Sequence, residues 1–340
     1  MGGPAPKRTR IGDVARAAGV SKGTVSRVLN HHPDVSPVSR QRVTSAIARL
    51  RYMPSPVARA LSRRSTRAIG ILIPDLADPV FMQMVRGVEG VASGQNYAVM
   101  LGESGRSAAK EVSFCDLMSQ FLVAGVLIAG GTATIDREFA RHVGAIPTVV
   151  LGRRSSSGTF PASTVDHCAG GRAAIQYLLE LGHRRIGLVG GDQASEAGVG
   201  RQRGYLDALR AWDVPPEPAL MQPTDFALAS GMAATARLLD ARPAPTAVWF
   251  ASDELALGGL RVIKDRGLRI PADISVAGFN DIPYAAISDP PLTTMRWPAK
   301  ELGTVAMRML AELIETGGPV HDATFTPELV VRASTAPPAA

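Results

Sequence analysis

The chain has 340 residues, of which 46% are hydrophobic, so it is long enough to bury sizeable cores in two or three domains. Its net charge of +7 is unevenly spread, because residues 1–67 hold fourteen Lys and Arg against two Asp, a net +12, and the remaining chain carries −5. A basic excess confined to one end favours nucleic acid over an anionic membrane as the partner. No apolar run reaches the roughly 18 residues of a membrane span, and the first ten residues lack the apolar core of a signal peptide. We therefore expect a cytoplasmic protein.

Residues 11–30 have the pattern of a helix-turn-helix. Residues 12–18 and 24–29 are each predicted to be helical, and Gly19 lies between them, where a tight turn requires a residue that adopts the left-handed conformation. Ser21 is placed to cap the second helix. The apolar residues spaced to meet across this turn are Val14, Ala18, Val20, Val25 and Val28.

The polar residues around the second helix are candidates for contacts with DNA. Basic side chains on a small helix are commonly a solvated surface, but Lys22 lies at the N-terminal end, where entry into the major groove brings side chains to base edges. Arg27 has the fork geometry that pairs with O6 and N7 of guanine, whereas Gly23 has no side chain to read a base. The residues predicted to contact phosphates or bases are Ser21, Lys22, Thr24, Ser26, Arg27 and Asn30.

A third helix is predicted at 37–50, because Ser36 followed by proline is a helix start. The sequence Pro-Ser-Pro at 54–56 then breaks the chain and starts a short helix at 57–61. This helix has about two turns and too little apolar surface to be stable alone, so we expect it to fold only against a partner. Residues 62–67 are predicted to be a linker.

From residue 68 short apolar runs alternate with helical stretches such as 170–180 and 200–211. Such runs are typical of strands buried in parallel sheets. Two consecutive series imply two doubly wound lobes, with a ligand site in the cleft at the carboxyl ends of their strands. The tail after about Ala336 is expected to be disordered. The predicted strands are 68–74, 96–101, 125–130 and 147–151 in the first series and 185–190, 246–250 and 274–279 in the second.

Several patterns of catalytic chemistry are matched only in part. Residues 19–23 fit G-x-S-x-G by letter, but a nucleophile elbow follows a strand and here a helix precedes it. Residues 198–204 have one residue too many for a dinucleotide fingerprint, and no P-loop sequence occurs. The histidines at 31–32 lack ligand partners at metal spacing, and His183 marks a helix-to-strand turn. We expect no catalytic residue, metal or cofactor. The two cysteines are expected to be free thiols in a reducing compartment: Cys115 and Cys168.

Five segments together resemble the lactose/galactose repressor family of bacterial transcription regulators. They are DVARAAGVSKGTVSRVLN, YMPSPVARAL, LGHRRIGLVG, SDELALGGLRVIKDRGLRIPADISVAGFND and PPLTTMRWP. The resemblance runs from about Arg10 to Ala333. It implies a homodimer or tetramer whose paired headpieces bind near-palindromic operator DNA. It also implies a core similar to periplasmic sugar-binding proteins, which takes a small-molecule effector such as a sugar or sugar derivative.

The resemblance assigns a role to the predicted short helix at 57–61. In the family this helix folds in the minor groove, where Leu61, with Ala58 beside it, would insert between central base pairs. Ser55 stands where the family usually has asparagine, and Pro56 is also unusual there. Both residues are able to start a helix, but the contacts of that turn with DNA are open to change.

The resemblance also implies an effector site in the cleft. Phe81 and Tyr205 match aromatic residues that contact the ligand from the first and second lobes, although both could instead be core residues. Arg172 matches a residue that hydrogen-bonds sugar hydroxyls in some members. Members often carry aspartate at the position of Asn280, which leaves a change of ligand preference open. The residues expected to bind the effector are Phe81, Arg153, Arg172, Tyr205, Ser252, Asp253 and Asn280.

These patterns predict an α/β fold: an N-terminal helix-turn-helix headpiece and a two-lobed, doubly wound parallel-sheet core that is periplasmic-binding-protein-like. They predict a sequence-specific transcriptional repressor whose effector changes the angle between the lobes, with induction and co-repression both open. The alternatives, a sugar-binding transport receptor and an α/β enzyme, do not account for residues 1–67. The predicted domains are a headpiece at 1–53, a hinge and linker at 54–67, a core at 68–336 and a disordered tail at 337–340. Within the core, the first lobe is predicted near 68–161 with a return near 291–320, and the second lobe near 162–290 with the C-terminal segment.

Overall fold

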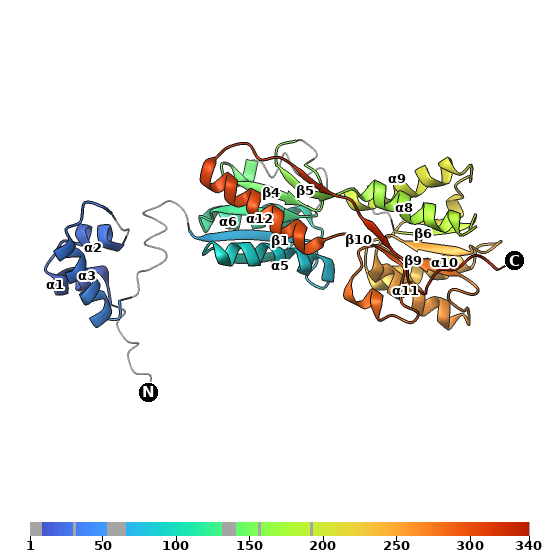
Figure 1. The fold of residues 1–340 in the computed structure, drawn as a ribbon, viewed down its shortest axis with the longest axis horizontal. Coiled ribbons are helices and arrows are strands. Elements are labelled where there is room, and N and C mark those ends of the chain that lie inside the picture. Colours follow the sequence, from blue (N-terminus) through green and yellow to red (C-terminus); the bar gives the residue numbers. More distant parts are fainter. Residues whose placement is uncertain are drawn as a thin grey trace, which may run out of the picture. The chain divides into compact units, whose positions relative to one another are not determined.

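The computed structural model describes residues 9–29, 32–52, 66–130, 141–155, 158–190 and 193–339. The chain divides into two compact units, Met1–Thr66 and Arg67–Ala340, which we call the headpiece and the core (Figure 1). The predictions made for Asn30, for Ala58 and Leu61, and for a helix at 57–61 lie outside the described residues.

The described residues of the headpiece form three helices around a small core. The predicted helix-turn-helix is confirmed: Gly19 has a φ of +65°, and the Ser21 hydroxyl accepts a hydrogen bond from the Thr24 N–H at 3.0 Å. The third helix begins as predicted, with Ser36 accepting from the Ser39 N–H and proline at the first helical position. The three helices are α1 (Ile11–Ala18), α2 (Lys22–Leu29) and α3 (Pro37–Arg49). Their buried apolar residues include Val14, Val25, Val28 and Val43.

The first lobe of the core is built on a six-stranded parallel sheet. The strand order is β11-β5-β4-β3-β1-β2, so consecutive strands of the chain are joined by crossovers, as expected for a doubly wound sheet. The four strands predicted in this lobe are confirmed, and β5 and β11 were not predicted. The strands are β1 (Ala68–Ile73), β2 (Ala98–Glu103), β3 (Gly125–Ala129), β4 (Thr148–Leu151), β5 (Ala162–Val165) and β11 (Ala323–Phe325).

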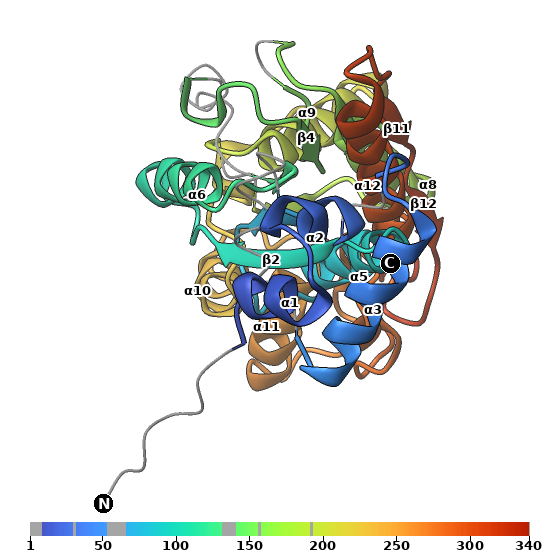
Figure 2. The ribbon, with the colours of Figure 1, turned by 90° about the vertical axis from the view of Figure 1, so that its left-hand side faces the viewer.

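Helices cover both faces of this sheet. Helix α6 (Ala108–Gln120) lies on one side of β2, and α5 (Pro79–Gly94) lies with α12 (Ala299–Thr316) on the other (Figure 2). Helices α5 and α12 approach each other closely at Gly87. A Cβ atom at this position would lie 1.9 Å from the carbonyl oxygen of Lys300, so only glycine fits there. The C-terminal helix α12 therefore packs as part of the first lobe.

The second lobe has a four-stranded parallel sheet with the order β7-β6-β8-β9. Helices α8 and α9 pack on one face, and α10 and α11 pack on the other. The three strands predicted here are confirmed, and the two-residue strand β7 was not predicted. The strands are β6 (Ile186–Val189), β7 (Met221–Gln222), β8 (Ala247–Phe250) and β9 (Ser275–Ala277). The helices are α8 (His167–Glu180), α9 (Glu196–Ala211), α10 (Leu228–Leu239), α11 (Asp253–Asp265) and the short 3-10 segments η1 (Pro218–Leu220) and η2 (Pro283–Ala286).

The chain passes between the lobes after β5, after β9 and after β11. Beside the last two passages lies an antiparallel ribbon of β10 (Thr294–Arg296) and β12 (Glu328–Val330) (Figure 1). Asp281 accepts hydrogen bonds from Arg296 and Arg332 at 2.6 Å, which ties these passages together. The predicted lobe boundary near 161 is therefore one strand too early, because β5 pairs with β4 in the first sheet.

The C-terminal segment is held against the second lobe. The Val276 N–H donates to the carbonyl of Ser334 at 2.8 Å, and the imidazole of His183 hydrogen-bonds the carbonyl of Ala336 at 2.9 Å. His183 thus serves at a helix-to-strand turn, as its sequence context indicates, and it also anchors the end of the chain. The chain is fixed at least as far as Ala336.

Candidate functional site

The exposed side of α2 is the candidate DNA-contacting surface of the headpiece. Lys22 and Arg27 are exposed, and Thr24 and Ser26 are half-buried, while Val25 and Val28 of the same helix point into the headpiece core. Ser21 and Thr24 are engaged with each other, with their hydroxyl oxygens 3.0 Å apart. The two predicted base-reading side chains are thus both exposed: Lys22 is the first residue of α2, and Arg27 lies in its last turn. Entry of this helix into the major groove requires such exposure.

A cavity of about 70 Å³ lies between the two lobes of the core. Its walls come from loops at the carboxyl ends of the strands of both sheets and from the helices that follow them, such as α5 and α9. Ligands bind at this edge of the sheet in doubly wound folds. This volume is well below the roughly 300–1,000 Å³ of a ligand site. A sugar-sized ligand therefore requires the lobes to move apart or side chains to swing aside. The lining consists of Asp78, Val80, Phe81, Met84, Arg106, Gly130, Gly152 and Arg153 from the first lobe and His167, Ser195, Glu196, Ala197, Arg201, Phe226, Asn280 and Trp297 from the rest of the core.

Arg201 on α9 is a buried cation in this lining. Its guanidinium donates to the carbonyl of Ala251 and, at 3.2 Å, to Oδ1 of Asn280, and it lies 3.9 Å from the centre of the Phe279 ring. Its Nε has no hydrogen-bond partner among the described residues. Burial lowers the pKa of Arg201 to about 9, so the side chain is charged at neutral pH.

Asn280 is held at the edge of the cavity in an uncommon backbone conformation. Its φ is +118°, and its Oδ1 accepts hydrogen bonds from Arg201 and from Nε1 of Trp297, both at 3.2 Å. Both partners are donors only, which determines that the amide oxygen faces them. The Nδ2 group of Asn280 is left as a donor for other groups.

A second arginine, Arg106, extends from the first lobe across to the second. Its guanidinium lies 5.0 Å from the centre of the Phe226 ring, a cation–π contact between the lobes. Asp78 caps α5 by accepting from the Val80 N–H at 2.9 Å, and burial raises the pKa of its carboxyl group, opposed by the charges of Arg106 and Arg201. A carboxylate oxygen of Glu196 accepts from the N–H of Arg154, which is a further contact between the lobes.

His167 is buried beside Arg201 and is uncharged at neutral pH. Burial, together with the positive charge of Arg201, lowers its pKa to about 3. The ring hydrogen-bonds the carbonyl of Gly152 through Nε2 at 3.0 Å. His167 thus adds polar surface to the cavity and no charge.

Three of the residues predicted to bind the effector line the cavity: Phe81, Arg153 and Asn280. The structure places Arg172 away from it, exposed on α8, with a contact to the Cys168 thiol at 4.0 Å. Arg201 occupies the place in the cleft that was expected for Arg172. Nothing in the immediate sequence of Arg201 indicated this place, because Tyr205, four residues further along α9, belongs to the core.

Three further predicted residues lie behind the cavity and not in it. Tyr205 is 1% exposed, stacks on Trp249 and donates its hydroxyl to the carbonyl of Ile186 at 2.8 Å, so it belongs to the core. Ser252 caps α11 by accepting from the Leu255 N–H. Asp253 is fully buried, and its carboxylate accepts hydrogen bonds from Thr294 and Ile282 in the segments that connect the lobes. Residues that the sequence did not indicate, and that line the cavity, are Asp78, Arg106, His167, Glu196, Arg201, Phe226 and Trp297.

Replacing Tyr205 with phenylalanine tests its assignment to the core. We expect the free energy of unfolding to fall by about 1–2 kcal/mol, because a buried hydrogen bond to the carbonyl of Ile186 is lost. The affinity for effector should not change, because the hydroxyl does not reach the cavity. Urea denaturation and ligand titration measure the two quantities. A weakened affinity for effector with unchanged stability would return Tyr205 to the ligand site.

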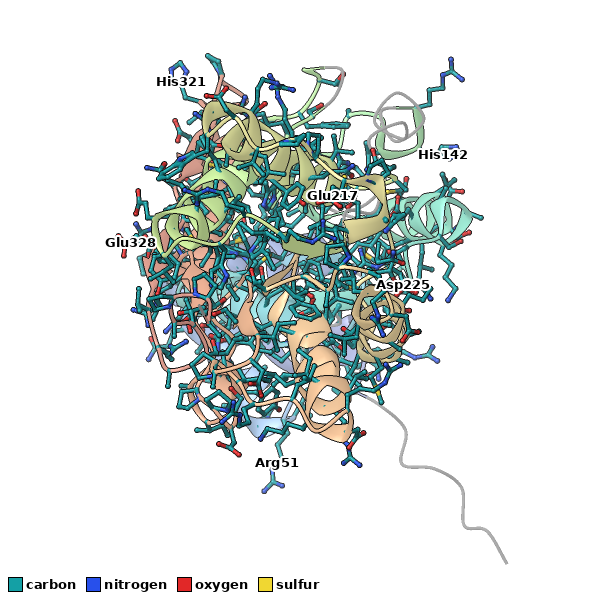
Figure 3. The ribbon with its side chains drawn as sticks, turned by 90° about the vertical axis from the view of Figure 1, so that its right-hand side faces the viewer. Arg51, His142, Glu217, Asp225, His321 and Glu328 are labelled. Carbon is teal, nitrogen blue, oxygen red and sulfur yellow. The ribbon has the colours of Figure 1, made fainter. Side chains whose placement is uncertain are left out.

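The structure also shows the state of the cysteines, the positions of the histidines and the apolarity of the helices. Cys115 and Cys168 are free thiols, as predicted. Within the described residues no group of His, Cys, Asp and Glu is arranged to hold a metal ion, and His142 and His321 lie at separate places on the surface of the core (Figure 3). None of the helices in the described ranges has the length and apolarity to cross a bilayer.

Two family models match the chain. The model of bacterial regulatory proteins of the lacI family matches residues 10–55, and the model of the periplasmic binding protein-like domain matches residues 175–335. The first match covers the three helices of the headpiece. The second covers most of the second lobe and continues through α12.

Relatives are similar over almost the whole chain. The sequence is 34% identical over 328 residues to the HTH-type transcriptional repressor CytR of Escherichia coli strain K12, with 95% of each chain covered. It is 36% identical over 338 residues to the HTH-type transcriptional regulator MalR of Streptomyces coelicolor, with 96% of this chain and 97% of the relative covered. Both relatives are regulators of transcription.

Solved structures with both units are also similar. The lac repressor dimer bound to operator and the anti-inducer ONPF has a TM-score of 0.85 and 28% identity, with 97% of this chain and 100% of that chain covered. The complex of the transcriptional regulator CelR with cellobiose has a TM-score of 0.71 and 31% identity, with 96% and 100% covered.

Proposed function

Because the chain belongs to the lacI family of bacterial regulatory proteins, we propose that it is a sequence-specific repressor of transcription that a small polar effector controls. The observation that carries this proposal is the presence in one chain of an exposed helix-turn-helix surface and a two-lobed core with a polar cleft. A sugar-binding receptor would need only the second of these. The similar proteins CelR and lac repressor are seen with cellobiose and with operator DNA, which supports a sugar or sugar derivative as effector and a homodimer on a near-palindromic operator.

The cleft provides a physical basis for control by the effector. Arg106 reaches it from the first lobe, and Arg201 and Asn280 reach it from the other side. A ligand that bonds both sides favours one angle between the lobes, and it shifts the equilibrium by its difference in affinity for the two arrangements. The headpieces of a dimer would then change their spacing on DNA.

The headpiece residues have separate proposed roles. Lys22 and Arg27 read base edges, and Ser21, Thr24, Ser26 and Asn30 contact phosphates or bases around them. Ala58 and Leu61 are proposed to enter the minor groove, on the basis of the family resemblance and of their sequence. We assign no catalytic role to the cleft, since the relatives are regulators of transcription, and we place the protein in the cytoplasm, where operator DNA is.

Replacing Arg27 with alanine tests the base-reading role. On an operator selected from random DNA by the wild-type protein, we expect a loss of about 1–3 kcal/mol in binding free energy, and little loss on unselected DNA. Fluorescence anisotropy at one salt concentration measures both. The control is Arg16→Ala, because Arg16 is an exposed arginine of α1 and should lose only salt-dependent affinity, equally on both DNAs. Equal losses for Arg27→Ala on both DNAs would contradict base reading.

A further inference from the structure

The polar atoms left for a ligand in the cleft are mostly hydrogen-bond donors. The Nε–H of the buried Arg201 has no acceptor among the described residues, and Nδ2 of Asn280 is left to donate because Oδ1 already accepts twice. The guanidinium of Arg106 contacts the Phe226 ring and adds further N–H donors from the first lobe. A ligand that satisfies these groups must be rich in acceptors.

The charges of the lining do not cancel. Three arginines, Arg106, Arg153 and Arg201, face two carboxylates, Asp78 and Glu196, while His167 is uncharged. Even with both carboxylates ionised, the lining carries one net positive charge. The carboxylates of Asp78 and Asp253 offset part of the charge of Arg201 electrostatically, but among the described residues no carboxylate is hydrogen-bonded to its guanidinium. A ligand with a negative charge would bond this guanidinium directly and relieve the cost of burying it.

Asn280 lies at the position where a carboxylate would contact Arg201 directly. Among the described residues Arg201 forms no ion pair, and the side chain that accepts its hydrogen bond at 3.2 Å is the neutral amide of Asn280. An aspartate there would pair with the guanidinium, would neutralise the lining and would offer acceptors to the hydroxyl groups of a neutral sugar. The amide instead leaves the guanidinium of Arg201 without a hydrogen-bonded carboxylate among the described residues, and it presents a donor.

We propose that the effector is an anionic sugar, in which a carboxylate or phosphate group binds between Arg201 and Nδ2 of Asn280. The hydroxyl groups bond the remaining polar lining, and Arg106 approaches the ligand from the first lobe. This inference rests on the proposed function of the cleft as an effector site and adds the charge of the ligand. It assigns Asn280 as the residue that selects an anion over a neutral sugar.

The test compares matched acids and neutral sugars on the full chain without DNA. Melting temperatures are measured with glucose, glucuronate, gluconate and glucose 6-phosphate, and with the galactose counterparts, at constant ionic strength. We expect at least one acid to stabilise the wild-type protein with an affinity at least about tenfold above that of its neutral counterpart, a difference of about 1.4 kcal/mol. Comparison of glucuronate and gluconate with glucose 6-phosphate shows whether a carboxylate or a phosphate group is bound.

The variant Asn280→Asp should reverse this preference. It keeps the size and shape of the side chain, and we expect the acid to bind at least about tenfold more weakly and the neutral sugar to bind as well or better. The control is Asn96→Asp, which makes the same change at another asparagine with a positive φ, exposed in the turn before β2 and not part of the cavity lining. This control should leave all affinities unchanged.

Each outcome decides the question. The proposal is overturned if no acid stabilises the wild-type protein, if a neutral sugar binds as tightly as its acid, or if Asn280→Asp leaves the ratio unchanged. Operator binding is measured separately by anisotropy, so a protein that prefers anions but does not bind a selected operator refutes the proposed function and leaves the ligand assignment standing.

Discussion

Replacing Arg201 with methionine is expected to abolish the response of operator binding to effector. In the cleft Arg201 combines a charge with an N–H that has no acceptor in the described structure, and each charge-assisted hydrogen bond to a ligand contributes about 1.5–3 kcal/mol. With two such bonds lost, the affinity for effector should fall at least about 100-fold. Methionine keeps an unbranched apolar side chain at this position but loses the cation–π contact with Phe279 and the hydrogen bonds to Ala251 and Asn280, so the stability of the variant is measured alongside.

Operator affinity without effector should stay within a few-fold of the wild type, because the substitution lies in the core and not in the headpiece. The matched control is Arg172→Met, which removes an exposed arginine from the neighbouring helix α8. It should keep the full response to effector. Anisotropy titrations of operator with and without effector give both quantities. A normal response in Arg201→Met, or a lost response in Arg172→Met, would show that the cleft is organised as the family resemblance implied and not as the structure places it.

Replacing Asp253 with asparagine is expected to change how stability depends on pH. The carboxylate is fully buried, accepts from the Thr294 hydroxyl at 2.5 Å and from the Ile282 N–H at 2.9 Å, and its burial raises the pKa to about 6. Because this pKa lies about two units above that of an unfolded chain, the folded protein holds the proton more tightly. The resulting stabilisation is complete below about pH 4 and is lost as the pH rises through about 6.

Two pKa units correspond to about 3 kcal/mol. The free energy of unfolding of the wild type, relative to that of Asp253→Asn, should therefore fall by about 3 kcal/mol between about pH 4 and pH 7. Chemical denaturation at a series of pH values measures this difference. The control is Asp225→Asn at an exposed site (Figure 3), where hydrogen bonds from Ser230 and the Ala227 N–H lower the pKa and the wild type should gain with rising pH. A difference for Asp253 that does not vary with pH would show that its carboxyl group is not shifted.

The headpiece could be predicted because its determinants are local. Gly19 takes the left-handed turn, Ser21 and Ser36 cap helices, and the apolar spacing selects one face. The apolar strands of the core could be predicted for a similar reason, since a strand buried on both faces is a continuous apolar run. The strand β5 was missed because its sequence is ASTV, and its polar Ser163 is satisfied by the carbonyl of Leu302, which is distant in the sequence.

The residues that line the cleft could not be predicted from the local sequence. Arg172 and Arg201 are arginines on successive helices of one lobe, and nothing in their immediate sequences decides which one reaches the ligand site. That choice depends on how α8 and α9 are rotated, which is set where Gly171 and Gly204 bring the two backbones together: a Cβ at Gly204 would lie 2.3 Å from the carbonyl oxygen of Cys168.

The sequence by itself thus determined the helix-turn-helix and the two doubly wound lobes, because turn residues, caps and apolar periodicity act between near neighbours. The kind of regulator followed from the resemblance of five segments to a known family. Only the tertiary structure decided that Arg201 and Arg106 line the cleft and that Tyr205 and Asp253 lie behind it. These placements depend on packing and on hydrogen bonds between residues such as Arg201 and Asn280, 79 positions apart, and such contacts exist only in the folded chain.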